Sequence, residues 1–310
     1  MDFSLNDDRR MLSETLERFL ADNYDMDTRH GNVMSDKRFS PELWSKFAEL
    51  GIIGALFSEE AGGFGGEGVD LMVVFEALGR SLVVEPFLPT LLAGKILEAT
   101  GQNDLLEEVI AGEKLIALAH GEPSARYDIS HVSCEAKQSG DSWEISGHKS
   151  VVLGAPSATH FVVSARTSGQ TDDENGISVF LVEKQPSLQL RDYGTLDGYA
   201  AAELYFDKTE ATLLGELNEG YALVEKALAY GTTALTAELL GAMEVAKDLT
   251  VEYMKQRKQF GVAIGQFQAL QHRMADVLIE LEQMRSAVIN AAGNLTSERK
   301  VREKYISSEK

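Results

Sequence analysis

The stretch Tyr253–Val277, YMKQRKQFGVAIGQFQALQHRMADV, lies between two long segments that have the apolar spacing of helices. Where they meet, the chain gathers cations, an aromatic ring and glycines: Arg257, Lys258, Phe260, Gly261 and Gly265. The simplest interpretation is a helix end, because cations near a helix C-terminus complement the macrodipole and Gly261 then stops the helix. That interpretation leaves Phe260 and the glutamines that follow it unexplained.

A second interpretation, nucleotide binding, uses the whole cluster. A diphosphate favours a fixed cation with several donors, which Arg257 provides. A flat heterocycle favours an apolar ring beside it, which Phe260 provides. An amide side chain such as that of Gln268 can bond a ribose or an adenine edge.

Helical periodicity extends from this corner in both directions. One pattern runs from about Gly220 to Gln256 and a second from Gln266 to Asn294; a third opens at Ser297 and reaches Lys310 without a cap. This third pattern starts an apolar face that is not completed. We therefore expect either that the chain is truncated at residue 310 or that a partner supplies the missing helical layer.

The first hundred residues also predict helices. Asn6 and Asp7 can cap the first one, and Ser40-Pro41 starts another that Gly51 ends. Three more patterns cover Val69–Leu82, Leu88–Ala99 and Leu105–Ile110.

Short β-type runs separate the two helical regions. There are seven: Leu115–His120, Ile129–Ala136, Ser142–Gly147, His160–Ala165, Ile177–Glu183, Leu188–Tyr193 and Ala202–Phe206. Short strands at this spacing predict a barrel or sandwich instead of a parallel sheet. The predicted fold class is therefore α+β, with an N-terminal all-α domain at 1–113, a middle antiparallel β-barrel or sandwich domain at 114–218, and an incomplete C-terminal helical bundle at 219–310.

The charge and the cysteine content limit the partners and the cellular location that we expect for this chain. The net charge of −20 argues against nucleic acid and anionic membranes as partners, because both need clustered basic residues. The N-terminus shows no signal peptide and no run approaches a membrane span. Cys134 stands alone, which excludes an internal disulfide and suits a reducing cytoplasm, so a cytoplasmic location is expected.

Three other kinds of site are not expected. Gly63–Gly68 fits the spacing GxGxxG, but it follows a helical segment instead of a strand, so we interpret it as a flexible surface loop. The histidines lack ligand spacing, so no metal is expected. No GxSxG elbow or Ser-His-Asp pattern stands out, and acyl-enzyme chemistry is not expected either.

The segment RKQFGVAIGQFQALQHRMADV closely resembles a signature of the acyl-CoA dehydrogenase family, and the order helices, β domain, helices resembles that family too. The pair Ala119–Pro123 and Ile145–Lys149 adds to the resemblance, which covers essentially the whole chain. Among subfamilies, MDFSLNDDRRML, GEPSARYD and AELLGAMEVAKD are most similar to small subunits of pimeloyl-CoA-type heteromeric dehydrogenases.

The resemblance implies a reaction and its partners. Family members desaturate an acyl-CoA thioester: a carboxylate removes the α-proton while the β-hydrogen leaves as hydride to FAD, and electrons pass to an electron-transfer flavoprotein. This places the chain in fatty-acid metabolism and β-oxidation. Donors that hold the thioester oxygen stabilise the developing enolate.

The resemblance also implies site residues. The corner residues Arg257, Gln259, Phe260 and Gln268 match those that reach the ADP part of FAD in a neighbouring subunit, which implies a homo- or hetero-tetramer with a related subunit. At the flavin end the matching positions are His120, Gly121 and Leu153. There Gly121, Val151 and Leu153 replace residues that usually bond or cover the flavin ring.

The catalytic base is not identified. In most members it is a glutamate well downstream, which is expected beyond residue 310; in some branches it lies on the long helix, where this chain has Gly231 and Thr232. Alternatives therefore stay open: a catalytic dehydrogenase subunit, a non-catalytic support subunit of a heteromer, or a flavin oxidase or monooxygenase on the same fold. A structural helical protein and a CoA-binding module without redox chemistry are further alternatives.

Overall fold

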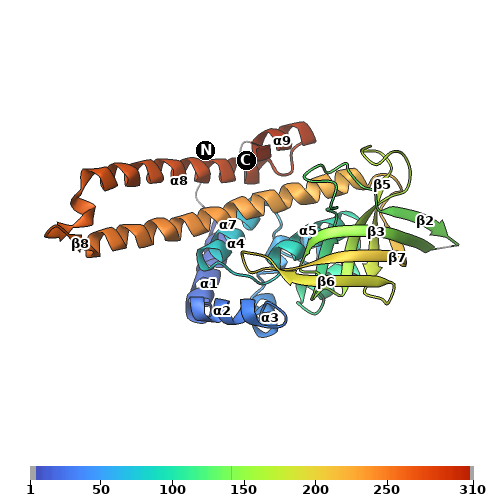
Figure 1. Cartoon of the computed structure of the whole chain (residues 1–310), viewed down its shortest axis with the longest axis horizontal. Coiled ribbons are helices and arrows are strands. Elements are labelled where there is room, and N and C mark those ends of the chain that lie inside the picture. The colour runs from blue at the N-terminus through green and yellow to red at the C-terminus, as the bar shows by residue number, and fades with distance from the viewer. Residues whose placement is uncertain (1–4, 141, 308–310) are drawn as a thin grey trace. The chain divides into compact units, whose positions relative to one another are not determined.

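The computed structural model describes residues 5–140 and 142–307, and of Ser307 only the backbone. Helices come first, strands follow, and long helices close the chain (Figure 1). Contacts divide the chain into two compact units. One comprises Met1–Thr28, Glu67–Val83 and Thr232–Lys310, and the other Arg29–Gly66 and Val84–Gly231.

The early helices begin where their caps predict. In α1 (Asp7–Asn23) the Asn6 side chain accepts from the backbone N–H of Arg9 at 2.9 Å. Ser40 caps α3 (Pro41–Glu49) in the same way. The remaining helices of this region are α2 (Met26–Met34), α4 (Gly68–Ser81), α5 (Phe87–Ala99) and α6 (Asn103–Ile110), with short 3-10 turns at Gly54–Leu56 and Glu59–Ala61.

The glycine-rich segment is a loop, as predicted, with Phe64 exposed, but some of its glycines are buried. A Cβ on Gly63 would lie 2.3 Å from the Phe57 carbonyl oxygen, and a Cβ on Gly68 would lie 2.1 Å from the Ala292 carbonyl oxygen. Gly66 has φ 83°, which a glycine adopts without strain. These glycines are therefore needed for close backbone packing, which the sequence spacing alone does not reveal.

The middle region is a seven-stranded β structure. Its strands are β1 (Ile116–Ala119), β2 (Glu135–Ser139), β3 (Ser142–Leu153), β4 (His160–Arg166), β5 (Ile177–Glu183), β6 (Leu188–Gly194) and β7 (Ala200–Leu214). The pairings β4–β2–β3–β7–β5–β4 close a ring, while β1 joins β4 and β6 joins β7. Closure makes this a barrel, and alternate side chains such as Ile145, Phe161 and Phe180 fill its buried core.

Two details of the barrel differ from the sequence pattern. The pairs β1–β4 and β2–β4 are parallel, while the other pairs are antiparallel. The second strand begins at Glu135 instead of Ile129. The backbone N–H groups of Ser133 and Cys134 donate to the Glu122 carboxylate, so they do not join a strand ladder. The alternation of buried Val132 and Cys134 in this segment imitated a strand.

The C-terminal region is dominated by two long helices, α7 (Gly220–Gln256) and α8 (Gln268–Asn294), which Figure 1 shows side by side and joined at their corner. Arg285 of α8 forms ion pairs with Glu244 of α7 and with Glu76 of α4. The last helix, α9, spans Arg299–Ser307, while the predicted end at Lys310 lies outside the described residues.

Candidate functional site

The corner between α7 and α8 is a small β-hairpin. Strand β8 (Lys258–Gln259) pairs with β9 (Val262–Ala263), and the turn residues Phe260 and Gly261 have φ values of 53° and 83°. Two successive positive φ values define a type I′ turn, which fits a two-residue hairpin. The expectation that Gly261 stops the helix is therefore wrong: α7 ends at Gln256, and Gly261 serves the turn instead.

Some residues of the corner have structural roles. Gly265 lies against α7, where a Cβ would come within 3.0 Å of the Met254 carbonyl oxygen. The Gln271 amide donates to the Gly265 carbonyl at 2.8 Å. A 3-10 turn at Ile264–Gln266 then leads into α8.

The four residues predicted to contact the ADP part of FAD are exposed: Arg257, Gln259, Phe260 and Gln268. Within the described part of the chain, the three polar side chains among them have no hydrogen bond or ion pair. The Phe260 ring is 93% exposed and meets the Phe267 ring edge-on at 6.3 Å. The structure therefore brings together a free guanidinium, free amides and an open aromatic ring, which fit a nucleotide's phosphates, ribose and base.

The predicted flavin end lies on the barrel. His120 points inward, its Nδ1 is 2.8 Å from Ser164 Oγ, and its pKa is lowered to about 3, first by burial and then by the Lys149 charge. The His120 ring is therefore neutral near pH 7 and already has a protein partner. Gly121 is exposed, and its carbonyl accepts from the Ser150 N–H at 2.8 Å.

Two apolar residues follow on strand β3. Val151 is 58% exposed with φ 52°, an unusual backbone conformation for a β-branched residue, and its N–H donates to Glu203. Leu153 is half-buried. Neither Val151 nor Leu153 offers a side-chain donor, so these two predicted positions provide only backbone groups and apolar surface.

A buried ion pair supports this end of the barrel. Lys149 Nζ lies 2.8 Å from Glu122 Oε1, and both side chains are buried. Glu122 also accepts from the backbone N–H groups of Ser133 and Cys134. Burial alone would raise the pKa of Glu122, but Lys149 and these donors outweigh it and lower the pKa to about 2.

Space for a base at Gly231 is already filled. A Cβ on Gly231 would lie 2.5 Å from Leu92 Cδ2 and 3.6 Å from Leu88 Cδ1. Its neighbour Thr232 carries a hydroxyl, which is a poor base near neutral pH. A carboxylate side chain from position 231 would have to displace Leu92 of α5.

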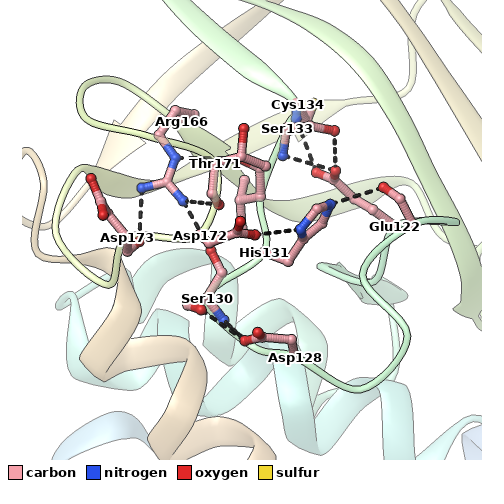
Figure 2. A network of polar contacts seen from close by, with 12 residues as sticks. Glu122, Asp128, Ser130, His131, Ser133, Cys134, Arg166, Thr171, Asp172 and Asp173 are labelled. Carbon is pink, nitrogen blue, oxygen red and sulfur yellow. Dashed lines mark hydrogen bonds and ion pairs between the residues drawn. The ribbon is translucent and has the colours of Figure 1, made fainter.

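Sequence reasoning missed one cluster. Ser124 Oγ is 2.9 Å from His131 Nε2, and His131 Nδ1 is 2.6 Å from Asp172 Oδ1 (Figure 2). No Ser-His-Asp pattern stands out in the sequence, yet the structure brings these three side chains into hydrogen-bond contact. Ser124 and His131 share the loop between β1 and β2, while Asp172 lies in the loop between β4 and β5, so no local sequence motif joins the three residues.

Neither a metal site nor a membrane-spanning helix is present among the described residues. Within residues 5–140 and 142–307, no three His, Cys, Asp or Glu side chains are placed to hold a metal ion. None of the described helices combines the length and apolar character that crossing a bilayer requires.

Known proteins match over the whole chain. Three domain models fit: acyl-CoA dehydrogenase N-terminal domain at residues 6–112, middle domain at 117–209 and C-terminal domain at 218–310. The 3-(aryl)acrylate reductase of Clostridium sporogenes is 30% identical over 82% of this chain and 71% of its own length. The caffeyl-CoA reductase-Etf complex subunit CarC of Acetobacterium woodii is 30% identical over 84% of this chain and 72% of its own.

A solved structure agrees. The "Tcur3481-Tcur3483 steroid ACAD" variant has a TM-score of 0.85 and 30% identity, covering 97% of this chain and 83% of that chain. The fold and the matched domains define an FAD-dependent class of oxidoreductases that act on CH–CH donors. This chain belongs to that class, the acyl-CoA dehydrogenase family.

Proposed function

We propose that this chain is a subunit of an FAD-dependent acyl-CoA dehydrogenase and that its α7–α8 corner binds the ADP part of FAD held by a neighbouring subunit. The observation that carries the proposal is the free, exposed set Arg257, Gln259, Phe260 and Gln268 on and beside the β8–β9 hairpin. Each side chain keeps its binding groups available, and holding Phe260 at φ 53° costs about 1–2 kcal/mol, which a purely structural turn would avoid by using Asn or Gly.

The roles of this chain's residues follow from the corner. FAD, if bound there, would supply the hydride-accepting chemistry of acyl-CoA desaturation. Arg257 pairs with the diphosphate, and the Phe260 ring packs against a flat part of the nucleotide. Gln259 and Gln268 bond the ribose or adenine edge.

We further propose that the partner is a related subunit, as in the pimeloyl-CoA-type heteromers, and that this chain mainly supports the partner's flavin. The space at Gly231 is filled by Leu92, and the flavin end lacks free side-chain donors. The Tcur3481-Tcur3483 name joins two components, which favours a heteromer. A groove of about 980 Å³ along α8 offers a surface for the partner; its lining includes the apolar Leu278, Ile279 and Met284 and the polar Glu282 and Asn290.

The electron acceptor and the acyl group belong to the same proposal. A relative is named as a subunit of a complex with Etf, which favours an electron-transfer flavoprotein as acceptor. The word steroid in the name of the solved relative favours a bulky or cyclic acyl-CoA. Such an enzyme would work in the cytoplasm.

The test is flavin content. The chain is purified alone and with a co-expressed related subunit, and FAD absorbance per chain is measured in each preparation. Little FAD alone and about one FAD per pair of chains in the complex supports the support-subunit function. One FAD per chain in the chain purified alone would exclude it. With acyl-CoA and no other acceptor, oxygen consumption would identify a flavin oxidase instead.

A further inference from the structure

We propose that Ser124, His131 and Asp172 form a second reactive site, in which Ser124 is acylated by acyl thioesters and then freed by water. The site uses no flavin and does not depend on the corner. Its three side chains come from two loops of the barrel and lie in one hydrogen-bonded row (Figure 2).

The atoms of the row have the order that nucleophile activation needs. A carboxylate oxygen accepts, so the tautomer that suits the contact with Asp172 carries its proton on Nδ1 of His131. That tautomer leaves Nε2 of His131 as the acceptor of the Ser124 hydroxyl at 2.9 Å. The imidazole is thus oriented by a carboxylate on one side and directed at a nucleophile on the other.

A buried arginine holds the histidine in place. Arg166 donates to the carbonyl groups on both sides of His131, those of Ser130 at 2.9 Å and Val132 at 3.2 Å. It also donates to the carbonyl groups of Thr171 and Asp173, which flank Asp172. One fixed guanidinium therefore sets the spacing of His131 and Asp172 through the backbone on either side of each.

The serine has a fixed support as well. It follows Glu122 by two residues, and the Glu122 carboxylate is anchored by Lys149 and by the N–H groups of Ser133 and Cys134. Ser124 itself is exposed, so its hydroxyl can meet a substrate from solvent. An acyl-transfer site requires a nucleophile that is held in position and accessible to substrate, and Ser124 meets both conditions.

The residues after Ser124 suit an acyl-CoA. In the described part of the chain, the backbone N–H groups of Arg126 and Tyr127 donate to no protein acceptor, which leaves them available for an oxyanion. The exposed Arg126 guanidinium has no acidic partner among the described residues and can pair with a phosphate of CoA. The family already acts on acyl-CoA thioesters, which are activated acyl donors.

The chemistry balances without an added reagent. Ser124 Oγ forms a bond to the thioester carbonyl carbon as its proton moves to His131 Nε2. The C–S bond breaks, and the thiolate takes that proton and leaves as a thiol. Water then attacks the ester, His131 relays its proton to Ser124 Oγ, and a carboxylic acid is released.

The experiment uses the purified full chain and an alkyl fluorophosphonate, with peptide mass spectrometry to locate the adduct. We expect labelling at Ser124 and none in S124A. The labelling rate should fall at least about tenfold in H131Q and D172N, because a general base accelerates a reaction by a factor on the order of 10²–10⁴. The matched control S130A removes a nearby hydroxyl that donates to Asp128 and not to His131, and should label like wild type.

A second readout follows thiol release from butyryl-CoA, which should be lost in S124A and kept in S130A. Unlabelled Ser124, or labelling at an undiminished rate in D172N, would overturn the proposal. Because the Asp172 side chain is 74% exposed, D172N is expected to keep its fold. If H131Q unfolds, the labelling rate of D172N alone tests the proposal.

Discussion

At the scale of single residues, the buried ion pair of Lys149 and Glu122 is important for stability, although nothing in the sequence marks it. Lys149 is fully buried, yet it bonds the Glu122 carboxylate, the His120 carbonyl and the Ser164 hydroxyl. Taking one partner away leaves the other charge buried without compensation, which costs more than the pair itself contributes.

Replacing Lys149 by Met should therefore lower the free energy of unfolding by about 3–5 kcal/mol, as measured by urea denaturation. The double variant K149M/E122Q removes both charges and should be clearly more stable than K149M alone. A K149M protein within about 1 kcal/mol of wild type would show that the pair is not buried as described.

The same pair predicts an acid response. The folded state lowers the pKa of Glu122 from 4.5 to about 2, so its stabilisation is complete above pH 4.5 and is lost as the pH falls toward 2. The contribution is about 3 kcal/mol. Unfolding free energy measured from pH 5 to 2 should fall less steeply in E122Q than in wild type, and equal slopes would contradict the assignment.

Phe260, by contrast, destabilises the fold, because its positive φ of 53° is strained for a residue with a side chain. F260N places a residue that tolerates positive φ in the turn, and should raise the free energy of unfolding by about 0.5–1 kcal/mol. Little burial is lost, because the ring is 93% exposed. Urea denaturation of F260N would contradict the strain if the variant were less stable than wild type.

At the scale of elements, the crossing of α4 and α7 depends on two glycines. A Cβ on Gly241 would lie 2.0 Å from the Glu76 carbonyl oxygen, and one on Gly79 would lie 1.9 Å from the Glu238 carbonyl oxygen. The backbones therefore touch where the helices cross, and no side chain fits between them.

This crossing gives a matched pair of variants. G241A should lower thermal stability, with a cost of about 1–3 kcal/mol from overpacking. Gly293 lies in α8, and a Cβ there would meet nothing within 4 Å. G293A should therefore raise the free energy of unfolding by about 0.5–1 kcal/mol. Equal melting temperatures for the two variants would argue against the close crossing.

Sequence patterns predicted the helices better than the turns and loops that connect the secondary-structure elements. Caps at Asn6 and Ser40 gave helix starts, and the helical period predicted from about Gly220 to Gln256 matches α7. The hairpin at Phe260–Gly261 was missed, because a two-residue β8 has no readable period. The Ser124–His131–Asp172 row was missed because it forms through tertiary packing, which periodicity does not encode.

At the scale of the whole molecule, apolar residues remain exposed on α7 and α8. They include Leu239 at 53%, Leu249 at 68% and Ile279 at 57%. A contiguous apolar surface on these helices would suit an interface. This surface and the corner agree with a chain that works in an oligomer, which is the central part of the proposed function.

The most direct test measures FAD affinity of the purified oligomer, formed with its related subunit, in R257Q and F260N. The matched control is K258Q, which removes an exposed charge from the same hairpin. We predict FAD binding at least about tenfold weaker in R257Q and F260N, with K258Q close to wild type. Unchanged affinity in both corner variants would contradict the claim that this corner binds the flavin nucleotide.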